Sequence, residues 1–194
     1  ELFLACTGLV LLMVGVFRGD RSAGWLSWIV VGAFAVAAWL SGYVTDGITV
    51  AFDGLFITDP FSLFTKRLTL LGAGAALLMS IDFNKREGIA RFEFPVLFLF
   101  ATLGMMMMIS AGDFLSLYVG LELQSLCLYV VAAYHRDNIR STEAGLKYFV
   151  LGALSSGMLL YGISLIYVFV GTTRFEVISG LFAESVRSSL GLTV

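Results

Sequence analysis

Two charged residues lie inside long apolar segments, where a helix that crosses a lipid bilayer normally carries no charge. Glu122 lies near the middle of the segment Asp113–Tyr134, and Lys147 lies within the next segment, Ser141–Val170. A charge at this depth costs about 3 kcal/mol, so such side chains usually face the interior of the helix bundle, a partner or water, and they often mark a proton path. The two positions therefore indicate proton transfer between a carboxylic acid and an amine.

The positions of Glu122 and Lys147 predict a coupled pair. The two segments are joined by the tight turn His135–Arg140, so their helices should be antiparallel neighbours. At ~1.5 Å per residue, the two side chains differ in depth by roughly 9 Å, which favours a pair bridged by water. At ~8 Å and an effective dielectric constant of about 20, the coupling is roughly 2 kcal/mol. Because this equals about 1.5 pK units, a proton on one group should change the proton affinity of the other.

A static interpretation of the pair stays open. Glu122 and Lys147 could instead form a fixed structural pair or bond to other subunits. Small residues and hydroxyls follow Lys147 on the same predicted helix, where they permit close helix approach and can hold water: Gly152, Ser155, Ser156 and Gly157. Each of them also serves simple packing.

The turn before Lys147 carries further polar residues. His135 titrates near neutral pH and could admit protons, although a loop residue at an interface is usually just solvated. We expect Ser141 or Thr142 to cap the helix that follows, with Glu143 close enough to its first turn to complement the helix dipole. Glu143 then needs no catalytic explanation.

The composition places the chain in a membrane. Of the 194 residues, 59% are hydrophobic and 13% are charged, whereas soluble domains are roughly half apolar and about a quarter charged. The few basic residues are dispersed, which excludes a nucleic-acid-binding face. One histidine and two cysteines supply neither a haem ligand pair nor an iron–sulfur cluster, so we expect the chain itself to bind no redox cofactor.

Apolar segments of the right length predict an all-α polytopic membrane protein with six transmembrane helices. Three regions follow from them. Residues 1–112 hold the first four helices, 113–170 hold the two that carry Glu122 and Lys147, and 171–194 form a terminal segment. The six segments are Leu2–Phe17, Trp25–Tyr43, Phe61–Ile81, Phe94–Ser110, Asp113–Tyr134 and Ser141–Val170.

Charges in the loops predict the orientation. Basic residues gather in alternate loops: Arg18, Arg21, Lys85, Arg86, Arg91, Arg136 and Arg140. The other loops carry acidic residues instead: Asp46, Asp53, Asp59 and Asp113. The positive-inside rule then puts the basic loops in the cytoplasm and the N-terminus outside. Lys66 and Arg67 interrupt the pattern, and we expect their long side chains to reach the membrane interface.

Local signals predict the structure of the outer loops. Alternating apolar residues around Asp53-Gly54 predict a β-hairpin near residues 48–57. Asp59-Pro60 should open the third helix, with Pro60 in its first turn, and Asp113 suits the N-cap of the fifth. Apolar residues at helical spacing within 175–190 predict a short amphipathic helix on the outer surface.

Two segments around the buried charges carry a resemblance to a known family. Gly120–Leu126 reads GLELQSL, and Ser141–Gly157 reads STEAGLKYFVLGALSSG. The sequence resembles subunit N of proton-pumping NADH-quinone oxidoreductase, respiratory complex I, and the likeness runs more weakly along the rest of the chain. Sodium–proton antiporters and related subunits share the charged positions but differ around them.

This resemblance implies a fourteen-helix antiporter-like fold with two inverted repeats, of which the chain corresponds to the N-terminal part. It implies that Glu122 and Lys147 are the paired charges of the first proton half-channel. It further implies a place in the bacterial inner membrane beside other membrane subunits of the complex, with NADH oxidation and quinone reduction carried out elsewhere in the complex. Two other functions stay open: a structural subunit with a static ion pair, and a subunit of a cation–proton antiporter.

Overall fold

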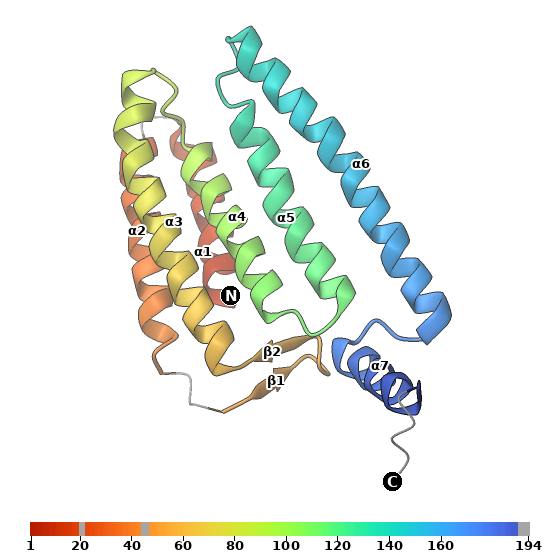
Figure 1. Ribbon diagram of the computed structural model, residues 1–194. Helices are drawn as coiled ribbons and strands as arrows, with labels where there is room; N and C mark the ends of the chain where they lie inside the picture. The colour runs from red at the N-terminus through yellow and green to blue at the C-terminus, as the bar shows by residue number, and fades with distance from the viewer. Residues whose placement is uncertain (20–21, 44–46, 190–194) are drawn as a thin grey trace.

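The protein is mostly helical, and its helices run side by side (Figure 1). The computed structural model describes residues 1–19, 22–43 and 47–189. Arg21 and Asp46, which belong to the predicted charge pattern, lie outside them, as does Leu190 at the end of the predicted amphipathic helix. The helices are α1 (Leu2–Arg18), α2 (Ala23–Leu40), α3 (Pro60–Arg86), α4 (Glu93–Ser110), α5 (Phe114–Ala132), α6 (Ile139–Val170) and α7 (Phe175–Ser189).

Five of these helices, α2 to α6, are long and apolar enough to cross a membrane. Helix α1 is equally apolar but has only 17 residues. Helix α3 continues past the predicted end at Ile81, because the basic residues Lys85 and Arg86 lie in its last turn, where they complement the helix dipole. The prediction of a polytopic helical membrane protein is confirmed.

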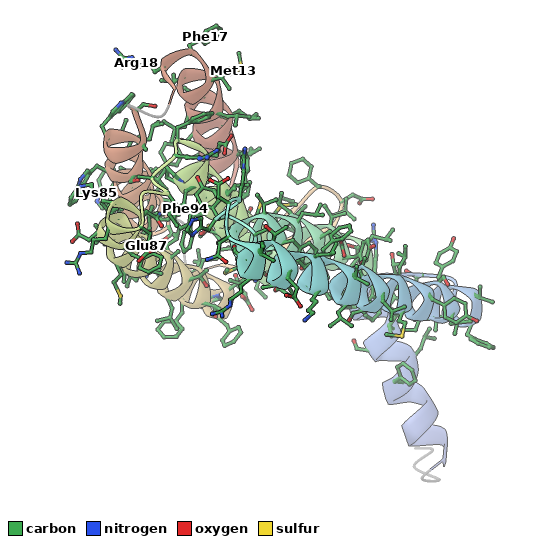
Figure 2. The ribbon with its side chains drawn as sticks, turned by 90° about the horizontal axis from the view of Figure 1, so that it is seen from above. Met13, Phe17, Arg18, Lys85, Glu87 and Phe94 are labelled. Carbon is green, nitrogen blue, oxygen red and sulfur yellow. The ribbon has the colours of Figure 1, made fainter. Side chains whose placement is uncertain are left out.

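The best-packed part of the protein is the bundle of α1, α2, α3 and α4. Its centre consists of fully buried leucines and valines, with Leu4, Leu26 and Leu99 each 0% exposed. Helix α5 packs against α4, and α6 packs against α5 at the far edge of the row (Figure 1). Figure 2 shows the same arrangement from above, with α5 and α6 extending away from the bundle. Large apolar side chains along α6, such as Leu151 and Met158, are therefore exposed.

The two ends of the row differ, and we name them by their content. The hairpin end carries strands β1 (Thr49–Ala51) and β2 (Phe56–Thr58), the α4–α5 loop and the start of α7. The opposite loop end carries the loops after α1, α3 and α5. Figure 2 views the molecule from this end, with Arg18 and Lys85 at its periphery.

Strands β1 and β2 pair antiparallel, with Val50 opposite Ile57. The turn between them uses left-handed backbone conformations at Phe52, Asp53 and Gly54, whose φ values are 53°, 56° and 90°. Two further contacts dock the hairpin on the helices. Gly112 donates its N–H to the Leu55 carbonyl at 2.8 Å, and Arg174 donates to the Asp53 carbonyl at 2.7 Å.

Aspartates begin two of the long helices, as predicted. The Ser62 N–H donates to Asp59 Oδ1 at 2.7 Å, the Asp59 N–H donates to Ser62 Oγ at 2.8 Å, and Pro60 lies in the first turn of α3. The hydrogen bond from the Ser62 N–H, assisted by the Ser62 hydroxyl, lowers the pKa of the Asp59 carboxyl. At the start of α5, Asp113 Oδ1 accepts from the Ser116 N–H at 2.8 Å.

The expected cap of α6 at Ser141 or Thr142 is wrong. The helix begins earlier, at Ile139, and Asn138 caps it by accepting a hydrogen bond from the Arg140 N–H. The reason is that an Asn side chain closes a tight turn onto the backbone two residues later. Glu143 consequently lies beyond the first turn of α6, where it was expected to complement the helix dipole, and its partner is Lys147.

Candidate functional site

Glu122 lies at the interface of α5 and α6 and is bonded by the hydroxyl of Ser156. Ser156 Oγ donates to Glu122 Oε1 in a short hydrogen bond. The Tyr118 hydroxyl lies 2.9 Å from the same Ser156 oxygen. Glu122, Ser156 and Tyr118 are all half-buried. Together they form a chain of three oxygen-bearing side chains that begins at a carboxylate in the middle of a membrane-length helix.

The spacing of small residues on α6 explains why Ser156 reaches Glu122. Gly145, Gly152, Ser156 and Ile163 share one face of α6, because seven and four residues correspond to nearly whole helical turns. A Cβ atom at Gly145 would overlap Ala133, and one at Gly152 would overlap the Tyr129 ring. Two glycines therefore bring α6 close to α5, and Ser156 follows on the same face one turn later.

The structure does not bring Lys147 toward Glu122. The Lys147 ammonium donates to Glu143 Oε1 at 2.6 Å, and its side chain is 70% exposed. Lys147 follows Gly145 by two residues, or about 200° around the helix, so it lies on the face opposite α5. Glu143 precedes Gly145 by two residues and reaches the same outer face. The expected pairing of Glu122 with Lys147 through water is thus replaced by a pair within α6.

An ion pair that the sequence does not predict lies in the α1–α4 bundle and includes a buried lysine. The Lys66 ammonium contacts Glu1 Oε1 at 2.9 Å, and the Lys66 side chain is only 8% exposed. The Ser110 hydroxyl donates to the same Glu1 oxygen, also at 2.9 Å. The expectation that Lys66 extends to the interface is therefore wrong.

A signal for this burial exists in the sequence. Lys66 shares the helical spacing of the buried leucines of α3, which are Leu63, Leu70 and Leu77. Its neighbour Arg67 does point outward, where it donates to the Ser41 carbonyl at 2.8 Å.

The loop end of the α5–α6 interface holds a cavity of about 520 Å³. Its walls include Tyr129, Ala133, Arg136 and Phe149. Arg136 is also paired with Glu93 of α4 at 3.1 Å. His135, half-buried in the adjacent turn, lies near this cavity in sequence, and its role in proton uptake stays a prediction.

Comparison with protein families gives one match in the second half of the chain. Residues 111–194 match the family described as NADH:quinone oxidoreductase/Mrp antiporter, TM. This range contains Glu122, Ser156, Lys147 and the whole of α5 and α6.

Curated relatives match the entire chain. NADH-quinone oxidoreductase subunit N of Rhodospirillum rubrum is 57% identical over 100% of this chain and 40% of its own length. The subunit N of Paramagnetospirillum magneticum is 58% identical over 94% of this chain and 38% of its own length. The chain thus spans about 40% of the length of the curated relatives it matches.

Solved structures share the fold. A chain of respiratory complex I from Thermus thermophilus, with bound aureothin, is 30% identical with a TM-score of 0.72, over 89% of this chain and 37% of that chain. A chain of the Mrp complex from Dietzia sp. DQ12-45-1b is 26% identical with a TM-score of 0.70, over 89% of this chain and 34% of that one. The predicted resemblance is confirmed: the chain is similar to the part of NADH-quinone oxidoreductase subunit N that it covers, and its second half matches the NADH:quinone oxidoreductase/Mrp antiporter family.

Proposed function

We propose that the chain is part of a proton-translocating membrane subunit of a bacterial NADH-quinone oxidoreductase, and that Glu122 binds and releases the transported proton. One observation carries this proposal. Glu122 is a half-buried carboxylate in a membrane-length helix, and its bonded partner is the hydroxyl of Ser156, which in turn lies within hydrogen-bond distance of the Tyr118 hydroxyl. Among the described residues, the ion pairs involve Glu1, Asp53, Glu93 and Glu143, and Glu122 is in none of them.

A carboxylate without a cationic partner is suited to proton exchange. A neighbouring ammonium would hold the carboxyl in its charged form, whereas hydroxyls can bond to the charged and the neutral form alike. We therefore assign the proton-exchanging role to Glu122. Lys147, held by Glu143 on the opposite face of α6, belongs to a second charged pair and does not exchange protons directly with Glu122.

The loop charges support an orientation for this subunit in the inner membrane. We propose that the loop end faces the cytoplasm, because Lys85, Arg86, Arg91, Arg136 and Arg140 all lie there. The hairpin end and the N-terminus then face the periplasm, with α1 as a sixth membrane span. The partners are the lipid bilayer and the other membrane subunits of the complex, which would carry out NADH oxidation and quinone reduction.

The replacement Glu122→Gln tests the proposal in the assembled complex. In inverted membrane vesicles, we expect normal amounts of complex, but proton pumping reduced by about tenfold or more, since a proton-carrying group is removed while its shape is kept. Glu143→Gln is the matched control, because it removes an exposed carboxylate from α6 and should leave pumping nearly unchanged. Loss of the assembled complex in Glu122→Gln would instead support a structural role for the residue.

A second candidate function is a cation–proton antiporter subunit, which the likeness to a chain of the Mrp complex favours. Proton pumping by reconstituted complex in sodium-free and sodium-containing buffer separates the two. Pumping that is independent of sodium supports the first proposal, and pumping that requires sodium supports the antiporter.

A further inference from the structure

Polar side chains continue beyond Glu122 along the α5–α6 interface, toward the hairpin end. Tyr118 lies one turn nearer that end than Glu122, and Ser156 of α6 joins the two. One further turn along each helix are Leu115 and Leu160, since residues three or four apart lie on the same helix face. These two leucines line a cavity of about 340 Å³. The hydroxyl pair therefore lies one helical turn from this cavity, with Leu115 and Leu160 between them.

The cavity continues along the same interface toward the end of the helices, and its mainly apolar walls carry three hydroxyl groups. Besides Leu115, Leu160 and Ile163, its walls include Ser164, Tyr167 and Thr173, each of which carries a hydroxyl. A water molecule takes about 30 Å³ in the liquid, so the space accommodates several waters beside polar partners.

At the hairpin end, the cavity is bordered by Thr173, which bonds to the buried Asp113. Thr173 Oγ1 donates to Asp113 Oδ2 at 3.3 Å, and Asp113 is 2% exposed. The Phe114 N–H also donates to the Thr173 carbonyl, at 3.1 Å. The α6–α7 loop is thereby fixed to the start of α5, which holds the two helices in register around the cavity.

We propose that Ser156 and Tyr118 conduct protons between Glu122 and the hairpin end, through the cavity lined by Ser164, Tyr167 and Thr173. This inference rests on the proposed function of Glu122 and adds the route that its proton takes. Hydroxyl groups suit such a route because each can donate one hydrogen and accept another at the same time.

The hydrogens can be followed one by one. Neutral Glu122 gives its proton to Ser156 Oγ, Ser156 passes its own hydrogen to the Tyr118 oxygen, and Tyr118 passes its own to a water in the cavity. Glu122 is left as a carboxylate, the water becomes hydronium, and each hydroxyl keeps one hydrogen. When Glu122 is ionised the hydrogen bonds have the opposite sense: Ser156 donates its only hydrogen to Glu122, so its bond with Tyr118 is one in which Tyr118 donates. This sense is the one that remains after a proton has left.

Variants that remove a single oxygen atom test the route in the whole complex. Ser156→Ala and Tyr118→Phe each delete one hydroxyl with little change in volume. We expect both to lower the rate of proton pumping about tenfold or more, and to enlarge its solvent isotope effect in D2O. Ser156→Thr keeps the hydroxyl and should restore pumping to near the wild-type rate. The matched controls are Ser155→Ala and Tyr161→Phe, which remove exposed hydroxyls of α6 and should pump normally.

The outcomes separate the route from the function of Glu122. If Glu122→Gln stops pumping while Ser156→Ala and Tyr118→Phe pump normally, the route is overturned and the role of Glu122 stands. If Ser156→Thr is as defective as Ser156→Ala, Ser156 acts by packing, and the route is also overturned. If Glu122→Gln itself pumps normally, the proposed function fails first.

Discussion

The α1–α4 bundle and the α5–α6 pair place charge inside the protein in different ways. In the bundle, the buried ammonium of Lys66 is neutralised by Glu1 at 2.9 Å. Between α5 and α6, the carboxyl of Glu122 is bonded by Ser156, whose oxygen in turn lies beside Tyr118. A paired charge holds helices together, whereas a carboxyl bonded by a hydroxyl has a partner that can bond to its charged and its neutral form alike. The comparison supports separate tasks for the two regions: support for the bundle, and the proposed proton exchange for the α5–α6 pair.

Helix α5 connects the two regions, because one of its sides contacts α4 and the other contacts α6. Toward α4, Gly104 lies against the backbone of Gly120 and Gln124, and a Cβ atom added at Gly104 would come within 2.7 Å of both. Such a contact leaves no room for water. Toward α6, the same helix presents Tyr118 and Glu122. The close contact with α4 thus fixes the position of α5, whose other side carries the residues of the proposed proton exchange.

The largest loss of stability should come from replacing Lys66, the charge partner of Glu1 in the bundle. Lys66→Met leaves the Glu1 carboxylate without its cation, which should cost about 3 kcal/mol of stability. The double variant Glu1→Gln with Lys66→Met should regain most of this loss, because no unpaired charge remains. Thermal unfolding of the detergent-purified complex measures both. Equal losses in the single and double variants would show that the pair is not what Lys66 contributes.

A smaller loss of stability should follow from disrupting the close contact between α4 and α5. Gly104→Leu forces a side chain against the backbone of α5, and overpacking of this kind costs about 2 kcal/mol. Because α5 must shift, we also expect slower proton pumping. Gly72→Leu, at a position of α3 with open space around it, is the matched control, and thermal unfolding checks both variants. A Gly104→Leu protein as stable as the control would show that the contact is looser than the structure indicates.

The smallest loss of stability should come from breaking the ion pair of Lys147 and Glu143 on the outer face of α6. Lys147→Met breaks an exposed ion pair between residues four apart, which is worth less than about 0.5 kcal/mol. We expect stability close to that of the wild type in the same unfolding assay, and near-normal pumping. A pumping defect as large as that of Glu122→Gln would mean that Lys147 shares the proton path, contrary to the relay proposed here.

Much of the fold can be predicted from the sequence because it depends on local signals. Long apolar runs identify the membrane helices, and the Asp-Pro pair and Asp113 mark two helix starts through their own side chains. The start of α6 cannot be predicted in the same way, because Asn138, Ser141 and Thr142 are all residue types that cap helices well. Only the path of the preceding turn decides among them.

Of the candidate site, Glu122 can be predicted from the sequence, but its partner Ser156 cannot be predicted from membrane depth alone. Glu122 stands out because its charge lies in an apolar run, but its partner depends on which face of α6 meets α5. The glycines Gly145 and Gly152 indicate that face and point to Ser156, whereas counting residues along the helix axis alone favoured Lys147. Depth in the membrane does not identify the partner of Glu122, because rotation around the helix decides which α6 side chain faces α5. Rotation around the helix likewise places Lys66 among the buried leucines of α3.

Infrared difference spectroscopy on the working complex tests the central claim most directly, because it detects the protonation of a single carboxyl group. We predict a carboxylic-acid C=O band that appears and disappears during turnover, is absent in Glu122→Gln, and shifts in Ser156→Ala as the hydrogen bond to Glu122 is lost. A wild-type spectrum without a turnover-dependent band that Glu122→Gln removes would contradict the claim that Glu122 carries the proton.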